Sequence, residues 1–296
     1  MKEFKSGFVS IVGRPNVGKS TLLNRIIGQK IAIISNKPQT TRNNILGIYH
    51  QDDLQMVFVD TPGIHRPFTK LGEAMMKSAD SAMRDGDVVL FLVEPTGGPG
   101  KTEEKIMADL KEMGLPVILV INKIDCVKKE SLLPVVAAYQ GAFDFAAVYM
   151  ISAKQNDGVE ALLKELSAYM PAGPMYYPED SVTDQPERQV VAELVREKLL
   201  GLLEQEIPHG LAIEVFSMKE KDKLYEIEIN IYCERGSHKG IVIGKGGSVL
   251  KEAGSLARAD IEEMLGKKVL LKLWVKVKDD WRNKEGFLRN FGYIGE

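Results

Sequence analysis

A glycine-rich stretch near the N-terminus has the residue types and spacing of a phosphate-binding loop. Residues 8–22 read FVSIVGRPNVGKSTL, which fits Gly-x-x-x-x-Gly-Lys-Ser through Gly13, Gly18, Lys19 and Ser20. Glycines let consecutive backbone N–H groups point at phosphate oxygens, the lysine reaches the terminal phosphates, and the serine hydroxyl binds Mg²⁺. The residues expected around the phosphates are Gly13, Asn16, Val17, Gly18, Lys19, Ser20 and Thr21.

A second stretch, VFVDTPG, ends an apolar run with residues suited to a metal-bound nucleotide. Asp60 follows a predicted strand directly, and Gly63 comes three residues later. A carboxylate in that position can hold Mg²⁺ through water, and a glycine amide can contact the γ-phosphate. We therefore expect Asp60 to join Ser20 at a magnesium site, and Gly63 to join Lys19 in catalysis.

The sequence NKID, after a later apolar run, has the chemistry of guanine recognition. An aspartate there can accept hydrogen bonds from the ring N–H and the exocyclic amine of guanine, which adenine cannot supply. The last apolar run of this half ends in SAK. The residues predicted on the guanine side are Asn122, Lys123, Asp125, Ser152, Ala153 and Lys154. All these stretches, in this order on successive strand ends, predict a GTP-binding domain.

The pattern of apolar runs predicts two domains of different fold. Over residues 7–169, short apolar runs alternate with amphipathic segments such as EEKIMADLKEMG. Unpatterned apolar runs separated by helices indicate a mostly parallel sheet with helices on both faces, the α/β class of a P-loop domain. Four prolines in the stretch that follows oppose both helix and central strand. The predicted organisation is a nucleotide domain over 1–170, a proline-rich linker over 171–187 and a second domain over 188–296.

The second domain is predicted to be α+β, in the order α-β-β-α-α-β. The expected elements are a helix over 188–203, strands over 212–218 and 224–232, a short helix, a helix over 248–265 and a strand over 269–277. Trp274 lies in the last strand and is expected in the core. Another glycine-rich turn, GKGG, falls between two helices and resembles the Gly-x-x-Gly signature of a KH domain. A loop in that setting can clamp the backbone of single-stranded RNA while an adjacent apolar groove receives the bases. The residues predicted to hold RNA are Gly244, Lys245, Gly246 and Gly247.

These motifs together resemble a known family. Residues 7–169 look like a small GTPase domain of the translation-factor-related class, and the second half looks like a type II KH domain with its Gly-x-x-Gly loop. With the stretches PQTTR and WVKVKDDWRNKEGFLRNFGY, the whole chain resembles the Era family of bacterial GTPases. The resemblance implies that Thr41 closes over Mg²⁺ as a catalytic and metal-site residue. It also implies binding to the 3′ end of small-subunit ribosomal RNA and a role in assembly of the small ribosomal subunit.

Two positions bear on the rate of GTP hydrolysis. Ile64 follows DTPG, where Ras-like proteins carry a water-positioning glutamine. Isoleucine cannot form a hydrogen bond with the attacking water, so we expect slow turnover of GTP to GDP and phosphate. Asn16 matches an asparagine that related GTPases use to coordinate K⁺, which makes K⁺ a second candidate cation; the alternative is an asparagine suited only to the turn. Arg14 and Arg42 are lesser candidates for contacts with phosphate or RNA.

Charge and composition leave alternatives open. The chain carries a net charge of −2, but residues 235–296 hold 13 Lys and Arg against 8 Asp and Glu, a net +5. A basic surface attracts RNA, and it also attracts anionic lipid. A membrane-associated signalling GTPase is therefore one alternative, and an RNA-binding scaffold that holds GTP without hydrolysing it is another.

Composition indicates a folded, reduced protein. The chain has 296 residues, 44% hydrophobic and 27% charged, and two cysteines more than a hundred positions apart. That pattern argues against a disulfide framework or a zinc site. The opening residues lack the apolar region of a signal peptide, and no apolar run approaches the length of a membrane span. We expect a cytoplasmic monomer, with peripheral contact at the inner face of the membrane as a further possibility.

Overall fold

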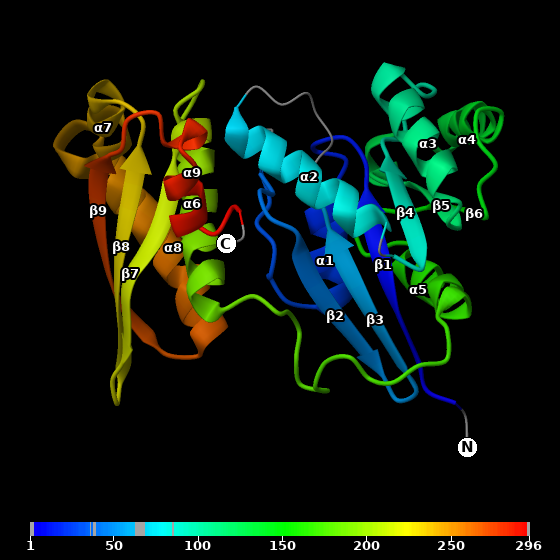
Figure 1. Cartoon of the computed structure of the whole chain (residues 1–296), viewed down its shortest axis with the longest axis horizontal. Coiled ribbons are helices and arrows are strands. Elements are labelled where there is room, and N and C mark those ends of the chain that lie inside the picture. Colours follow the sequence, from blue (N-terminus) through cyan, green and yellow to red (C-terminus); the bar gives the residue numbers. More distant parts are fainter. Residues whose placement is uncertain (1–2, 36, 38–39, 63–68, 85, 295–296) are drawn as a thin grey trace. The chain divides into compact units, whose positions relative to one another are not determined.

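The computed structural model describes residues 3–35, 37, 40–62, 69–84 and 86–294. Contacts divide the chain into two compact units (Figure 1). The first unit comprises Met1–Ala32, Thr41–Arg66 and Met75–Asp184, and the second comprises Ile33–Thr40, Pro67–Ala74 and Gln185–Glu296.

The first unit contains the predicted, mostly parallel sheet, with strand order β2-β3-β1-β4-β5-β6. The strands are β1 (Lys5–Val12), β2 (Ile45–Gln51), β3 (Leu54–Asp60), β4 (Val88–Val93), β5 (Val117–Ile121) and β6 (Ala147–Met150). All neighbouring pairs are parallel except β2 and β3, which form an antiparallel pair. The apolar runs predicted every strand but β2. Its residues ILGIYHQ mix polar with apolar side chains, as an edge strand allows.

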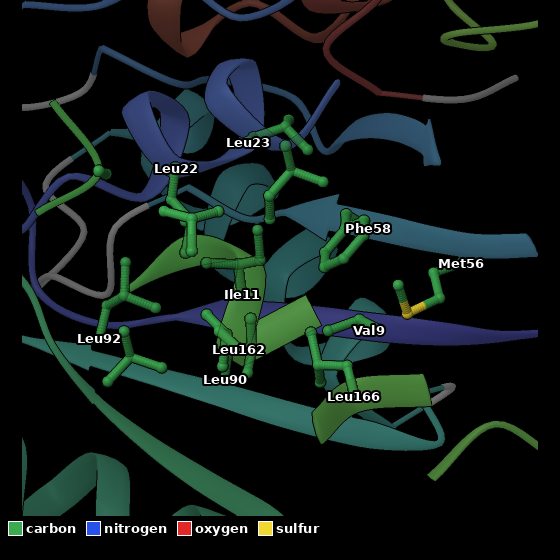
Figure 2. Packing of buried hydrophobic residues seen from close by; sticks show 14 of the residues in the cluster. Val9, Ile11, Leu22, Leu23, Met56, Phe58, Leu90, Leu92, Leu162 and Leu166 are labelled. Atoms are coloured by element: carbon green, nitrogen blue, oxygen red, sulfur yellow. The ribbon is translucent and has the colours of Figure 1, made fainter. Parts of the chain in front are cut away.

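Helices cover both faces of this sheet, as predicted. They are α1 (Lys19–Ile27), α2 (Lys70–Arg84), α3 (Lys101–Met113), α4 (Leu132–Gln140) and α5 (Val159–Tyr169). Figure 2 shows the core beneath α1 and α5, where Leu22 and Leu162 meet Ile11 of β1 and Leu90 of β4. A second core on the other face packs α3 and α4 against β4 and β5. Because both faces are buried here, the central strands β4 and β5 are apolar throughout.

The second unit has the predicted α-β-β-α-α-β order. Its elements are α6 (Glu187–Leu202), β7 (Ala212–Glu220), β8 (Leu224–Cys233), α7 (Gly236–Ile243), α8 (Ser248–Leu265) and β9 (Lys268–Val277), followed by α9 (Glu285–Asn290). The strand order is β7-β8-β9, with β8 antiparallel to β7 and parallel to β9. Helices α6, α7 and α8 lie on one face of this sheet (Figure 1), and their buried side chains form one core with those of the strands. The other face therefore has exposed side chains.

The two tryptophans differ in burial. The expectation that Trp274 belongs to the core is wrong, because 56% of it is exposed. Trp274 lies on β9, opposite Asn230 of β8. Its neighbours Leu273 and Val275 pack toward the helices. Alternation along a strand thus sends Trp274 to the open face. Trp281 is fully buried, and its Nε1 donates to the Gly210 carbonyl over 2.9 Å.

The proline-rich stretch before α6 has no helix or strand of its own. It follows the sheet of the first unit: Ser6 Oγ donates to the Pro174 carbonyl (2.7 Å), and the Ile48 amide donates to the Val182 carbonyl (2.9 Å). These bonds hold the stretch along the strand edge. The linker limits predicted from the sequence stay a prediction.

The sequence also carries predictions about the cysteines and about membrane-spanning helices. Cys126 and Cys233 are free thiols, as expected. No helix in the described part of the chain is long and apolar enough to span a bilayer.

Candidate nucleotide and RNA sites

The predicted phosphate loop joins the end of β1 to the start of α1. Gly18 has φ of +101°, and a Cβ atom there would lie 2.3 Å from Asn122 Nδ2, so only glycine fits. Lys19 is buried, and its Nζ donates to the carbonyls of Gly13 (3.1 Å) and Arg14 (3.0 Å). Burial lowers the pKa of Lys19, and the nearby Asp60 raises it in part. The lysine is thus held inside the curve of the loop.

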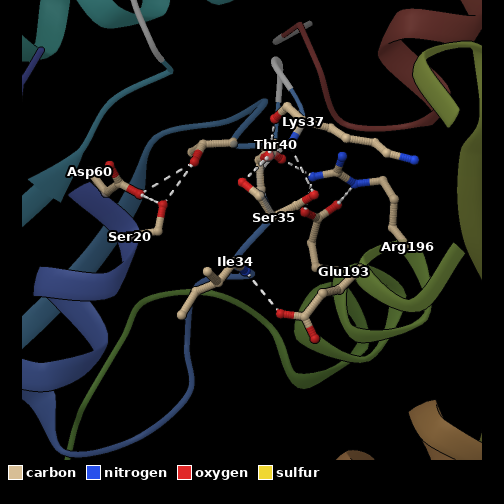
Figure 3. Close-up of polar contacts among 10 residues, drawn as sticks. Ser20, Ile34, Ser35, Lys37, Thr40, Asp60, Glu193 and Arg196 are labelled. Atoms are coloured by element: carbon tan, nitrogen blue, oxygen red, sulfur yellow. Dashed lines mark hydrogen bonds and ion pairs between the residues drawn. The ribbon is translucent and has the colours of Figure 1, made fainter. Parts of the chain in front are cut away.

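The three residues predicted to hold Mg²⁺ lie together, and Figure 3 labels two of them, Ser20 and Asp60. Ser20 Oγ lies 2.6 Å from Asp60 Oδ2 and 3.1 Å from Thr41 Oγ1, and Thr41 Oγ1 lies 3.4 Å from Asp60 Oδ2. Asp60 Oδ1 is buried and accepts no hydrogen bond from the described residues. Burial raises the pKa of Asp60, while Lys19 lowers it in part. Hard oxygen donors with one buried carboxylate fit a small divalent cation such as Mg²⁺.

The NKID and SAK stretches meet at the ends of β5 and β6. Asn122 is buried, its Nδ2 donates to the Val17 carbonyl (2.9 Å), and its Oδ1 accepts from the Ala153 amide (3.0 Å). Ser152 Oγ donates to Asp125 Oδ1 over 2.6 Å. This bond is the main reason that the pKa of Asp125 lies below its usual value. Asp125 is therefore an exposed, ionised acceptor beside the phosphate loop, the form that guanine recognition needs.

The other residues predicted for the nucleotide site lie in the phosphate loop, in α1 and after β6. Val17 is buried, and Thr21 lies in the first turn of α1. Asn16 adopts a left-handed conformation, with φ of +67°. Lys154 lies in the turn after β6, and its charge contributes to lowering the pKa of Asp125. Gly63, like Ile64, lies outside the described residues.

One connection was not foreseen from the sequence. The segment Ile33–Thr40 belongs to the second unit, although it directly precedes Thr41. Arg196 of α6 is fully buried, pairs with Glu193 and donates to the Thr40 carbonyl (Figure 3). The chain therefore passes from a backbone held by α6 to a predicted magnesium ligand within one residue. The sequence around PQTTR carries no signal of this contact, since it depends on a helix more than 150 residues away.

The GKGG loop lies between α7 and α8, as predicted. Gly244, Gly246 and Gly247 all have positive φ, from +60° to +80°. A Cβ at Gly244 would lie 2.6 Å from the Val249 side chain, so the turn needs glycine there. Beside the loop runs a groove with apolar and basic lining, formed by Gly247, Leu250, Lys251, Gly254, Ser255, Arg258, Leu271 and Leu273. An apolar floor with basic side chains suits bases and phosphates of a single strand.

Comparisons with known proteins agree with this geometry. Residues 8–123 match a family described as 50S ribosome-binding GTPase, and residues 206–282 match the KH domain family. The GTPase Era of Ruminiclostridium cellulolyticum is 52% identical over 98% of both chains. This chain belongs to the Era family of GTPases. The Era proteins of Alkaliphilus metalliredigens and Clostridium botulinum are 52% and 53% identical, again over 98% of this chain.

Solved Era structures share the fold over the whole length. A variant of Aquifex aeolicus Era bound to GDP·AlF4⁻ has a TM-score of 0.95, with 39% identity, 99% of this chain and 100% of that chain covered. Era in complex with MgGDPNP and nucleotides 1506–1542 of 16S ribosomal RNA has a TM-score of 0.94, with the same identity and coverage. The expected Era-like GTPase fold with a C-terminal KH domain is therefore confirmed.

Proposed function

We propose that this Era-family GTPase is a slow, Mg²⁺-dependent switch that binds single-stranded small-subunit ribosomal RNA and assists assembly of the small ribosomal subunit. The observation that carries the proposal is the pairing of two different phosphate-binding loops in one chain. One loop adjoins the Ser20, Thr41 and Asp60 oxygens, and the other adjoins a groove with basic and apolar lining. The first loop suits a nucleotide, and the second suits a polynucleotide.

In the nucleotide site, Lys19, Thr41 and Gly63 are the proposed catalytic residues. Ser20, Thr41 and Asp60 would hold Mg²⁺, which would supply positive charge to stabilise the phosphates during transfer. Lys19 is oriented by its contacts inside the loop and adds charge where the transferred phosphoryl group develops it. These roles follow the matching motifs, and the close approach of the three oxygens supports them.

A second cation, K⁺, is proposed at Asn16. Asn16 has a left-handed backbone conformation within the phosphate loop, and its side chain carries a carbonyl oxygen that can bind a cation. Ile64 offers no hydrogen bond to water, so a monovalent cation can supply charge that Ras-type enzymes gain from an arginine finger. The slow turnover and the K⁺ requirement are independent proposals, and each can be tested without the other.

For the RNA site, the relative in complex with nucleotides 1506–1542 of 16S ribosomal RNA supports the same class of ligand for this chain. It also favours RNA binding over the membrane-associated signalling alternative. We propose that the GKGG loop holds the RNA backbone while bases enter the groove between α8 and β9. We further propose that the protein acts as a cytoplasmic monomer; peripheral membrane contact stays an untested prediction.

The test of the RNA site is the double change Lys245→Asp with Gly246→Asp. The space around Gly246 is open, so the added carboxylates can be accommodated at the modest strain of a positive φ. We expect most of the affinity for a single-stranded 16S 3′-end RNA to be lost, while GDP binding is unchanged. A matched control is Gly97→Asp with Lys105→Asp, which alters a positive-φ glycine in open space and an exposed lysine of the first unit. RNA binding equal to that of the control would refute the RNA-binding role of the GKGG loop.

The test of the nucleotide site is Asp125→Asn. An amide cannot accept both guanine hydrogen bonds, but it can donate to the extra oxygen of xanthine. The variant should therefore prefer xanthosine triphosphate to GTP. Unchanged GTP affinity would refute the role of NKID. Single-turnover release of phosphate from GTP separates a switch from a scaffold that holds GTP without hydrolysis.

A further inference from the structure

Four side chains of alternating charge form a row of ion pairs beside the nucleotide site. Lys123 Nζ donates to Glu94 Oε1 over 2.6 Å, and Glu94 Oε2 lies 3.8 Å from Arg14 Nη2. The other edge of the Arg14 guanidinium forms an ion pair with Glu103. The row of ion pairs therefore runs from α3 through the phosphate loop and the end of β4 to the lysine of NKID.

The Glu103 end of this row of ion pairs is fixed. Glu103 is 3% exposed, and its Oε2 accepts a hydrogen bond from the Gly100 amide at the start of α3 (3.2 Å). Arg14 is held by this buried carboxylate, and its own carbonyl accepts from Lys19. The Arg14 guanidinium is thus directed at two carboxylates, which explains its presence in the loop without a role as a phosphate ligand.

The Lys123 end is fixed by the backbone. The Asn122 amide donates to the Val93 carbonyl over 2.9 Å, where β4 and β5 end side by side. Glu94 and Lys123 each follow that bonded pair by one residue, so their side chains start from adjacent points. Lys123 has φ of +64°, an unfavourable conformation for a residue with a Cβ. A short ion pair at such a position indicates a side chain that is held in one direction.

We propose that Glu94 is a positioning residue for guanine-nucleotide binding, which acts by holding Lys123 in its binding orientation. The inference rests on the proposed function, since it needs the NKID site to bind guanine nucleotide. A free lysine side chain loses rotamer entropy when a ligand orders it. Glu94 orders Lys123 before the ligand arrives, so the nucleotide binds a prepared site. Arg14 and Glu103 in turn keep the Glu94 carboxylate in place.

The first test is Glu94→Gln, which removes the charge and keeps the shape. The Lys123 and Glu94 side chains are 36% and 35% exposed, so solvent screens the pair. We expect a rise in the Kd of fluorescent GDP of about two- to five-fold. Glu94→Lys should give a larger loss, because it places a third cation beside Lys123 and Arg14. The matched control is Glu112→Gln on the exposed side of α3, which should bind GDP like the unaltered protein.

Two readouts distinguish positioning from a general loss of structure. In steady-state GTP hydrolysis, Glu94→Gln should raise KM and leave kcat unchanged, because Glu94 makes no contact with Ser20, Thr41 or Asp60 among the described residues. A purely structural defect would instead lower the active fraction and hence the apparent kcat. The second readout is a double-mutant cycle with Lys123→Met: once Lys123 is changed, Glu94→Gln should have no further effect.

The outcomes separate this inference from the proposed function. If the unaltered protein fails to bind GDP, the proposed function itself is wrong. If it binds GDP and Glu94→Gln matches Glu112→Gln, the positioning role of Glu94 is refuted. Additive losses in the cycle refute it too, since Glu94 would then act by a route other than Lys123.

Discussion

The side chain of Asn122 connects three segments of the nucleotide site, and its removal gives a sharp test of that architecture. Asn122→Ala deletes the bonds to the Val17 carbonyl and the Ala153 amide, both of which belong to buried residues. Asn122→Asp keeps the shape and can still accept from Ala153. It replaces the donor facing Val17 with a second, charged oxygen, so it removes that one bond and adds repulsion of the Val17 carbonyl.

The size of the effect follows from the burial of the two partners. Each buried backbone group left without a hydrogen bond costs about 1–3 kcal/mol, and a loop that can open to water reduces that cost. For Asn122→Ala we expect a combined loss of about 2–3 kcal/mol. If the nucleotide must restore the order of the loop, the loss appears mainly in affinity, as a rise in the GDP Kd of about 30- to 150-fold. Asn122→Asp should fall in the same range, because the new oxygen repels the carbonyl of Val17.

The assay is the release of fluorescent GDP after mixing with excess unlabelled GDP, together with circular dichroism melting without nucleotide. We expect faster release from both variants, with retained secondary structure at 25 °C. A variant Asn122→Ala that is folded and releases GDP at the unaltered rate would refute the reasoning. In that case, the bonds of Asn122 would stabilise the fold without shaping the site.

Three other predictions concern Ser152, Asn16 and Trp281. Ser152→Ala removes the main cause of the lowered pKa of Asp125, and GDP binding needs the ionised carboxylate. As the pH is lowered, the GDP affinity of this variant should therefore begin to fall at a higher pH than that of the unaltered protein. GDP titrations from pH 7 downward measure this, and identical pH profiles would contradict it. Asn16→Ala should abolish the faster GTP hydrolysis expected in KCl over NaCl at equal ionic strength, and equal rates in the two salts before mutation would dismiss K⁺. Trp281→Phe leaves the Gly210 carbonyl without its donor, and should lower the free energy of unfolding of the second unit by about 1–3 kcal/mol, measured by denaturant titration; an unchanged midpoint would contradict it.

The chemistry-bearing loops could be predicted because each is a local device. A run of a few residues such as GRPNVGKS dictates its own turn, its glycine conformations and the helix that follows, with little help from the rest of the chain. The apolar runs likewise predicted five strands, since burial on both faces leaves an unbroken apolar signature. The α-β-β-α-α-β order of the second unit was equally readable from its periodicity.

Features that depend on a distant partner could not be predicted. Strand β2 lies at the edge of the sheet, and its sequence lacks the apolar run by which the other strands were predicted. Trp274 lies on the open face because of the register of β9. The contact of Arg196 with Thr40 and the ion pair of Glu94 with Lys123 join residues 156 and 29 positions apart. The sequence by itself therefore determined which loops are the candidates for binding phosphate and guanine, because short-range backbone geometry decides them. Only the tertiary structure decided which charges face each other across those loops, because side-chain pairing depends on where separate strands and helices end.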